Sequence, residues 1–143
     1  MIQRWDRRAL TRYAIGAFYL LAGWQHLANP APFVAITPDW VPISKGAVVF
    51  WTGIAELLGA ALLLAWKQKA RAVGAMMLAL YALAVWPANF QHLFLDLERA
   101  DGGLGLAYHI LRLAAQPLLI WATLWSAGLA RWPFAKNKRA EKP

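Results

Sequence analysis

Residues 46–66 constrain the fold more than any other stretch, because the run is apolar throughout except for one carboxylate, Glu56, near its middle. As a helix, these 21 residues span about 31 Å, which matches the hydrocarbon core of a bilayer. The face that carries Glu56 also carries small residues, which allow close approach of another helix: Gly53, Gly59 and Ala60. A carboxylate at that depth needs a polar partner, so we predict that Glu56 belongs to a functional site.

The composition predicts a membrane protein. Hydrophobic residues make up 60% of the 143 residues and charged residues 15%, against about 45–50% and about 25% in soluble domains. The net charge is +8, but the basic residues stand at the ends of apolar runs, as membrane anchors do, so we expect no nucleic-acid partner. There is no cysteine, which excludes disulfides, thiolate metal sites and iron–sulfur clusters within the chain.

Four apolar segments predict an all-α fold, a polytopic antiparallel bundle of four transmembrane helices over residues 13–28, 46–66, 72–94 and 106–128. We expect one domain over residues 1–134 and a basic, disordered cytoplasmic tail over 135–143. The first span follows several arginines, as the apolar region of a signal peptide follows its basic region. It lacks a convincing small-residue cleavage site, and we expect it to be retained.

The connections between the spans differ in character. Residues 31–45 form a proline-rich loop with a single turn expected over 33–36, and residues 67–71 form a tight basic connection. Residues 95–105 are the acidic stretch and contain a glycine turn. Pro87 lies within the third span, where it removes the helical donor of the Leu83 carbonyl and predicts a kink.

The distribution of lysine and arginine predicts the orientation. Twelve of the fifteen lie on the side of both termini and of the connection 67–71, whereas Lys45 and Arg99 lie on the opposite side and Arg112 lies within a span. The positive-inside rule then places both termini in the cytoplasm of a bacterial-type plasma (inner) membrane.

Polar residues from all four spans fall toward the outer side. One face of the first span reads Gly16, Tyr19, Gly23 and His26, at helical spacing. The residues expected to form an outward-opening polar site are His26, Asn29, Glu56, Asn89, His92, His109, Arg112 and Gln116. Arg112 can reach inward to Glu56 and form a buried charge pair with it. The alternative is structural, with the pair neutralising itself and the amides tying helices together.

The ligand types favour a quinone over a metal. Histidine and carboxylate suit zinc, iron or copper, but no His-x-x-x-His or Glu-x-x-His pair fixes a geometry, and Arg112 opposes a cation, so we predict no metal site. The carbonyls of a quinone-like headgroup accept hydrogen bonds from His, Arg, Asn or Gln, and its tail partitions into lipid. No certain cofactor and no catalytic residue follow from the sequence.

Several motifs together resemble the DoxX family of small four-span membrane proteins. They include Gly23-Trp-Gln-His26, Gly53-Ile-Ala-Glu56-Leu-Leu-Gly59, Trp86-Pro-Ala-Asn89 with His92, and Tyr108-His109-Ile-Leu-Arg112 with Gln116-Pro117. The resemblance covers about residues 12–134. It implies a four-helix membrane bundle and, in some relatives, association with quinone-linked redox complexes such as thiosulfate:quinone oxidoreductase. Relatives that handle thiols use cysteines, which this chain lacks.

We therefore predict an accessory subunit or quinone-like binder in a membrane redox or detoxification system. Its partners are the lipid bilayer, a redox protein and further copies of itself, and any turnover needs a partner because no electron-carrying site is visible. The alternative is a non-catalytic assembly or stability factor whose polar core only specifies helix packing. A small-molecule carrier is less favoured, because no inverted repeat stands out.

Overall fold

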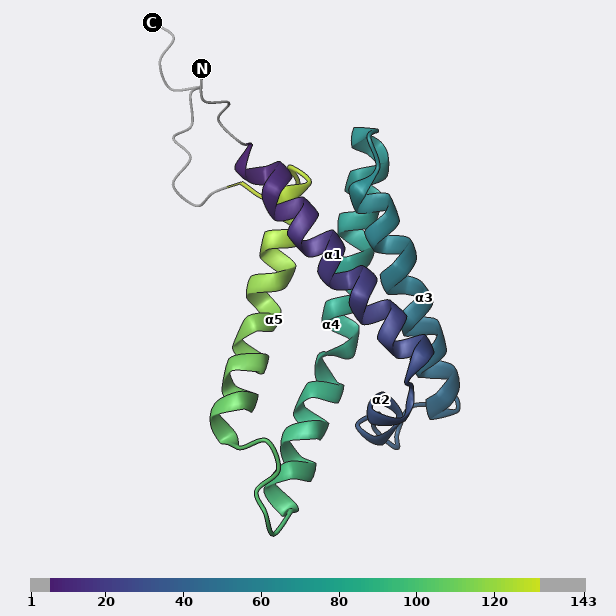
Figure 1. The fold of residues 1–143 in the computed structure, drawn as a ribbon, viewed down its shortest axis with the longest axis vertical. Helices are drawn as coiled ribbons and strands as arrows, with labels where there is room; N and C mark the ends of the chain where they lie inside the picture. The colour runs from purple at the N-terminus through teal and green to yellow at the C-terminus, as the bar shows by residue number, and fades with distance from the viewer. Residues whose placement is uncertain (1–5, 132–143) are drawn as a thin grey trace, which may run out of the picture.

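In the computed structural model, residues 6–131 are described, and within that range the chain is helical and contains no strand. Four long helices are present, as predicted, with a short fifth helix after the first (Figure 1). Their bounds are α1 Arg7–Ala28, α2 Ala31–Ala35, α3 Lys45–Leu64, α4 Gln68–Glu98 and α5 Leu106–Ser126. The all-α prediction is confirmed.

The long helices pack in chain order, α1 against α3, α3 against α4 and α4 against α5, each antiparallel to the one before (Figure 1). Helices α1 and α5 meet at the start of α1 and the end of α5. There Arg12 Nη1 donates to the Ser126 carbonyl at 3.5 Å and Arg8 lies over the Trp125 ring. Away from this contact the two helices diverge, so the bundle is a wedge, closed where α1 begins and open where it ends.

Local capping explains where the helices begin. Helix α1 starts at Arg7, earlier than the predicted residue 13, because the Asp6 carboxylate accepts a hydrogen bond from the backbone N–H of Arg8 at 3.0 Å. Helix α3 starts behind Ser44, whose hydroxyl accepts from the N–H of Ala47 at 3.2 Å. The turn expected over 33–36 is helix α2.

Helix α4 is longer than predicted at both ends, with 31 residues. It begins at Gln68, so the expected basic connection 67–71 mostly belongs to the helix. The Gln68 side chain donates to the Ala127 carbonyl at 2.7 Å and ties α4 to the end of α5. The helix continues through Pro87 to Glu98, which shortens the expected loop 95–105.

The remaining connection between α4 and α5 is a glycine-rich turn. Gly102, Gly103 and Gly105 have φ of 71°, 54° and 83°, conformations that glycine adopts without strain. Arg99 donates to both carboxylate oxygens of Asp101 at 2.8 and 2.7 Å, and these bonds hold the pKa of Asp101 well below its usual range.

The apolar core fills the closed end of the wedge. Its members come from α1, α3 and α4 and from the residue that follows α5: Ile15, Tyr19, Ala60, Leu63, Ala75, Leu78 and Ala127. Glycines bring the backbones together, as predicted for the face of Glu56. A Cβ placed on Gly53 would lie 2.9 Å from the His26 Cβ and 3.1 Å from the Gly23 carbonyl, so α1 and α3 touch almost directly.

Two of the described helices, α3 and α4, are long and apolar enough to cross a membrane. Helix α1 begins with three arginines, Arg7, Arg8 and Arg12, and α5 carries His109, Arg112 and Gln116, which lowers the hydropathy of both. The crossing of four helices therefore stays a prediction. The tail expected over 135–143 lies outside the described residues.

Candidate functional site

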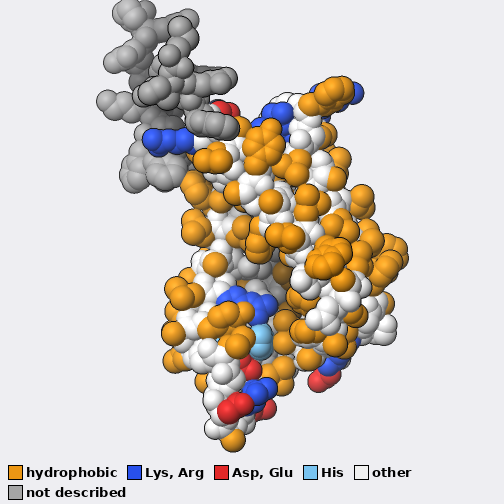
Figure 2. All heavy atoms as spheres, viewed as in Figure 1, with side chains coloured by type: hydrophobic (Ala, Val, Ile, Leu, Met, Phe, Trp, Pro, Cys, Tyr) orange, Lys and Arg blue, Asp and Glu red, His pale blue; other side chains and the backbone are white. Residues whose placement is uncertain are grey.

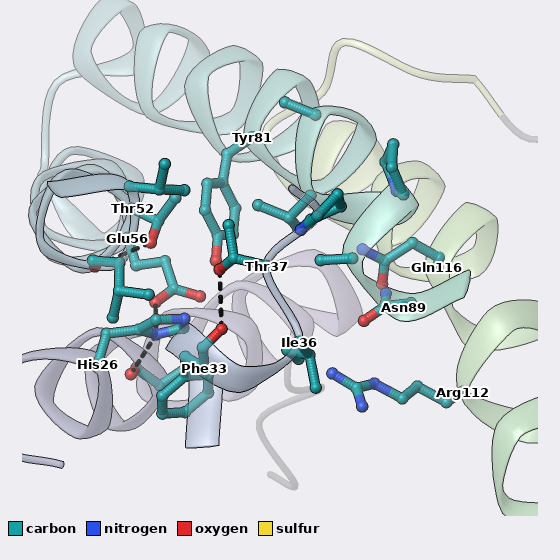
Figure 3. Close-up of a pocket in the computed structure, with 18 of the residues that line it drawn as sticks. His26, Phe33, Ile36, Thr37, Thr52, Glu56, Tyr81, Asn89, Arg112 and Gln116 are labelled. Carbon is teal, nitrogen blue, oxygen red and sulfur yellow. Dashed lines mark hydrogen bonds and ion pairs between the residues drawn. The ribbon is translucent and has the colours of Figure 1, made fainter. Parts of the chain in front are cut away.

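A cavity of about 340 Å³ lies at the open end of the wedge. It is walled by the second half of α1, the first half of α3, the middle of α4 and α5, and the segment after α2. Its polar lining residues are Tyr19, His26, Thr37, Thr52, Glu56, Tyr81, Asn89, Arg112 and Gln116 (Figure 3). Four helices and a loop therefore direct polar groups into one space, surrounded by apolar side chains.

Glu56 is bound on the α1 side of the cavity. Its Oε2 lies 2.8 Å from Nδ1 of His26, and the residue is 3% exposed. The same Nδ1 lies 2.9 Å from the Ala22 carbonyl, so one imidazole N–H faces two acceptors. Tyr81 of α4 lines the same cavity. The buried carboxylate is thus paired with an imidazole from the neighbouring helix α1.

The expected pair of Glu56 with Arg112 is not formed. Among residues 6–131 no ion pair joins them, and Figure 3 shows them on opposite sides of the cavity. The physical reason is the glycine contact between α1 and α3, which brings His26 against Glu56, while α5 packs on α4. Both residues line the same cavity, but the partner of Glu56 is His26 and not the predicted Arg112.

The opposite wall belongs to α4 and α5. Nη1 of Arg112 donates to Nδ1 of His92 at 2.5 Å, and the Gln116 amide donates to the Ala82 carbonyl at 2.9 Å. Ala82 lies one residue before Leu83, whose carbonyl lacks a helical donor because of Pro87. Asn89 is buried on the same wall. This side offers a cation and two amides to a ligand.

The segment after α1 closes the cavity, which the sequence analysis missed because it expected only a proline-rich loop with a single turn over 33–36. Phe33 stacks on the His26 ring with centroids 3.8 Å apart. The Thr37 hydroxyl donates to the Phe33 carbonyl at 2.8 Å, and Thr37 is buried. Proline spacing indicates a loop but carries no signal that the loop folds back over a helix end.

A second polar cluster lies beside the cavity, and it contains the other two predicted histidines. His92 and Asp96 lie four residues apart on α4, and His109 lies in the first turns of α5. The Asp96 Oδ2 accepts from the Leu104 N–H at 2.8 Å and lies 2.9 Å from Nε2 of His109 and 3.6 Å from Nε2 of His92. The spacing of His92 and Asp96 was visible in the sequence, but Asp96 was counted as part of a loop.

The eight predicted site residues therefore separate into three groups. Those that line the cavity are His26, Glu56, Asn89, Arg112 and Gln116. His92 and His109 form the adjacent cluster. Asn29 is exposed at the end of α1, where its N–H bonds the Gln25 carbonyl, and it belongs to neither site. The cavity is also lined by Tyr19 and Tyr81, which were not among the predicted site residues. Tyr19 stood on the face of the first span that carries His26.

An apolar groove adjoins the cavity on its α4 side. Its lining residues are Pro38, Trp40, Leu83, Trp86, Pro87, Phe90, Gln91 and Phe94, and three of them, Pro38, Trp40 and Pro87, also line the cavity. The polar cavity and the groove are thus contiguous across the proline of α4 and the loop after α2.

The comparison with known proteins gives one family. A family model described as a domain of unknown function (DUF8561) matches residues 15–127, which include every residue of the cavity and of the second cluster. No curated protein and no solved structure matches the chain.

Proposed function

The chain belongs to the DUF8561 family, for which no function is known, and from its own site we propose that it binds a quinone-like molecule in a membrane. In this proposal the protein is an accessory part of a redox or detoxification system, and a partner protein supplies any electrons. The observation that carries it is the cavity, where polar groups from four helices converge within apolar walls. The DoxX resemblance supports the same assignment.

The outer surface supports insertion of all four long helices. Besides α3 and α4, both α1 and α5 expose large apolar side chains: Leu10, Tyr13, Phe18, Leu21 and Trp24 on α1, and Leu106, Ile110, Leu111 and Leu118 on α5. Figure 2 shows hydrophobic side chains over most of the visible face. Such a continuous apolar surface suits lipid and is rare on soluble monomers. The basic residues at the helix ends support an orientation with both termini in the cytoplasm of a bacterial-type inner membrane.

Cysteine labelling tests this topology, because the chain has no cysteine of its own. We expect a cysteine introduced at Asp101 to react with a membrane-impermeant maleimide on intact cells, and one at Lys69 to react only after permeabilisation. The first residue lies in the α4–α5 connection and the second at the start of α4, at opposite ends of that helix. Equal labelling of both on intact cells would contradict the proposed orientation.

The cavity fits a small ligand with acceptors on two sides. Its volume is at the lower end of the roughly 300–1,000 Å³ range of small-molecule sites. His26 stands on one wall and, when protonated beside Glu56, can donate from Nε2, whereas Arg112 and Gln116 stand on the other wall. A ring with two carbonyl groups can then accept hydrogen bonds from both walls. The contiguous apolar groove then receives the hydrocarbon tail, which passes Pro38 and Pro87.

Arg112 is the substitution of choice for testing binding. For purified protein in nanodiscs titrated with a decyl-substituted benzoquinone, we expect Arg112→Gln to weaken binding by about 10-fold or more. A hydrogen bond from a charged group contributes about 1.5–3 kcal/mol, and each 1.4 kcal/mol is tenfold. The measurement is the dissociation constant by calorimetry.

Arg99→Gln is the matched control, because Arg99 is exposed in the α4–α5 connection and outside the cavity. We expect it to bind the quinone as the original protein does. If both substitutions weaken binding equally, or the original protein does not bind at all, the cavity is not the quinone site.

The alternative function is a non-catalytic assembly or stability factor. It is favoured by the polar contacts that already join helices without any ligand, such as Gln116 with the Ala82 carbonyl and His26 with Glu56. Native mass spectrometry of gently purified protein separates the two. A bound small molecule besides phospholipid supports the proposed function, and phospholipid alone supports the alternative.

A further inference from the structure

The second cluster brings three metal-ligating side chains together at the outer end of α4 and α5. One nitrogen or oxygen from each of His92, Asp96 and His109 lies within 4.8 Å of the others. His92 and Asp96 share a face of α4 because they are four residues apart. The tight glycine turn returns the chain so that the start of α5 presents His109 to the same carboxylate. A Cβ on Gly103 would collide with the Asp96 carboxylate, so this turn packs directly on the cluster.

The hydrogen bonding within the cluster is unbalanced. Three donors, the Leu104 N–H and Nε2 of both histidines, approach the single oxygen Oδ2 of Asp96 at 2.8, 2.9 and 3.6 Å. His109 is 1% exposed, so its Nε2 faces Asp96 in a site closed to bulk water. The bond from the Leu104 N–H to Asp96 is enough to hold the α4–α5 connection. It does not explain why two imidazoles also face this carboxylate.

We propose that His92, Asp96 and His109 bind a divalent transition-metal ion such as Zn²⁺. Two imidazoles and one carboxylate are the ligand types of such ions, and three protein ligands leave a fourth position open. With bonds of about 2.0–2.1 Å, tetrahedral donors lie about 3.4 Å apart. The distances from Asp96 Oδ2 to Nε2 of His109 and of His92, 2.9 and 3.6 Å, bracket that value. The ion takes the place of the Nε2 protons, and each neutral imidazole then carries its single proton on Nδ1. This inference does not depend on the proposed quinone binding.

The positive charge of Arg112 opposes a cation here, and its hydrogen bond to His92 leads to a specific prediction. Arg112 donates to Nδ1 of His92, so this nitrogen carries no proton and Nε2 does. When Nε2 binds a metal, the proton of neutral imidazole sits on Nδ1, where it meets the guanidinium. The metal and the Arg112–His92 bond therefore exclude each other, and metal binding releases Arg112 from His92.

Zinc titration of the full-length protein, purified with a tag that contains no histidine, tests the site. We expect one saturable equivalent of Zn²⁺ by calorimetry and elemental analysis, and none of Mg²⁺, which prefers oxygen ligands. His92→Gln and His109→Gln are expected to weaken zinc binding by more than about 100-fold, since even outer-shell partners of a metal site contribute about 10–100-fold. Two variants are used because His109 is buried and His92 is partly exposed.

Arg112→Gln separates a metal site from a merely structural cluster. It removes both the repulsion and the competing bond, so we expect zinc to bind tighter, on the order of tenfold. His26→Gln, which alters the third histidine of the chain, and Asp101→Asn, in the neighbouring turn, serve as controls and should leave zinc binding unchanged. Zinc binding that survives both His92→Gln and His109→Gln, or that Arg112→Gln weakens, overturns the proposal, as does the absence of saturable binding.

Discussion

Replacing Gly74 by alanine is expected to lower the free energy of unfolding by about 1–2 kcal/mol, although alanine is the better helix former. A Cβ at this position would collide with the backbone nitrogen of Leu63 and lie 2.7 Å from the Gly59 carbonyl. Backbone atoms cannot turn aside as a side chain can, so α4 must move away from α3. Overpacking of this kind costs about 1–3 kcal/mol, occasionally more, against a gain of about 1 kcal/mol in helix propensity.

Gly46→Ala is the matched control, since it makes the same change on α3 where the added Cβ would meet no atom within 4 Å beyond the local helix backbone. We expect it to leave stability unchanged or to raise it by up to about 1 kcal/mol. Both variants can be measured by denaturant titration in the same detergent micelle. If Gly74→Ala proves as stable as Gly46→Ala, the close packing of α3 on α4 is not as described.

His26→Leu is expected to lower the free energy of unfolding by about 3 kcal/mol or more, because it leaves the Glu56 carboxylate buried without its imidazole. Removing one member of a buried pair typically costs about 3–5 kcal/mol, whereas replacing both by apolar residues is often neutral. The double variant with Glu56→Leu should therefore be more stable than His26→Leu alone. A double variant that is more stable than one of its single variants indicates a buried pair.

In this double-mutant cycle, the free energy of unfolding is measured for both single variants and the double variant. Gln25→Leu, which changes an exposed neighbour on α1, is the control and should have little effect. Additive losses in the double variant would show that His26 and Glu56 do not interact. Quinone titration of the double variant adds a second result. A stable fold that no longer binds the ligand separates the proposed function from the assembly alternative, in which the pair only specifies packing.

The helices were predictable from the sequence because their signal is local. The apolar run around Glu56 and the glycines at 53 and 59 predicted a close-packed helix, and α3 spans Lys45–Leu64 with Gly53 against α1. Helix ends were predicted less well. The extension of α1 to Arg7 depends on one side-chain bond from Asp6, and α4 absorbs residues whose basic or acidic character suggested loops.

The site was predictable in membership but not in pairing. Depth along each helix predicted that Arg112 could reach inward to Glu56 in one outward-opening site, and both line the cavity. The rotation of each helix about its axis decides which of them touch, and that rotation is set by packing far from the site. Glu56 meets His26 because Gly23 fits against Gly53, and Arg112 meets His92 because α5 lies along α4. Asp96 was missed because it was assigned to a loop that is helical.

The divergence of α1 from α5 has a consequence for how a ligand arrives. The two helices are joined near Arg12 and Ser126 and separate toward the cavity. In the proposed membrane orientation, a molecule that reaches the cavity between these two helices stays in the hydrocarbon phase, so its occupancy follows its mole fraction in the bilayer and not its solubility in water. Competition for the cavity would then be decided by the lipophilic molecules that the membrane itself stores.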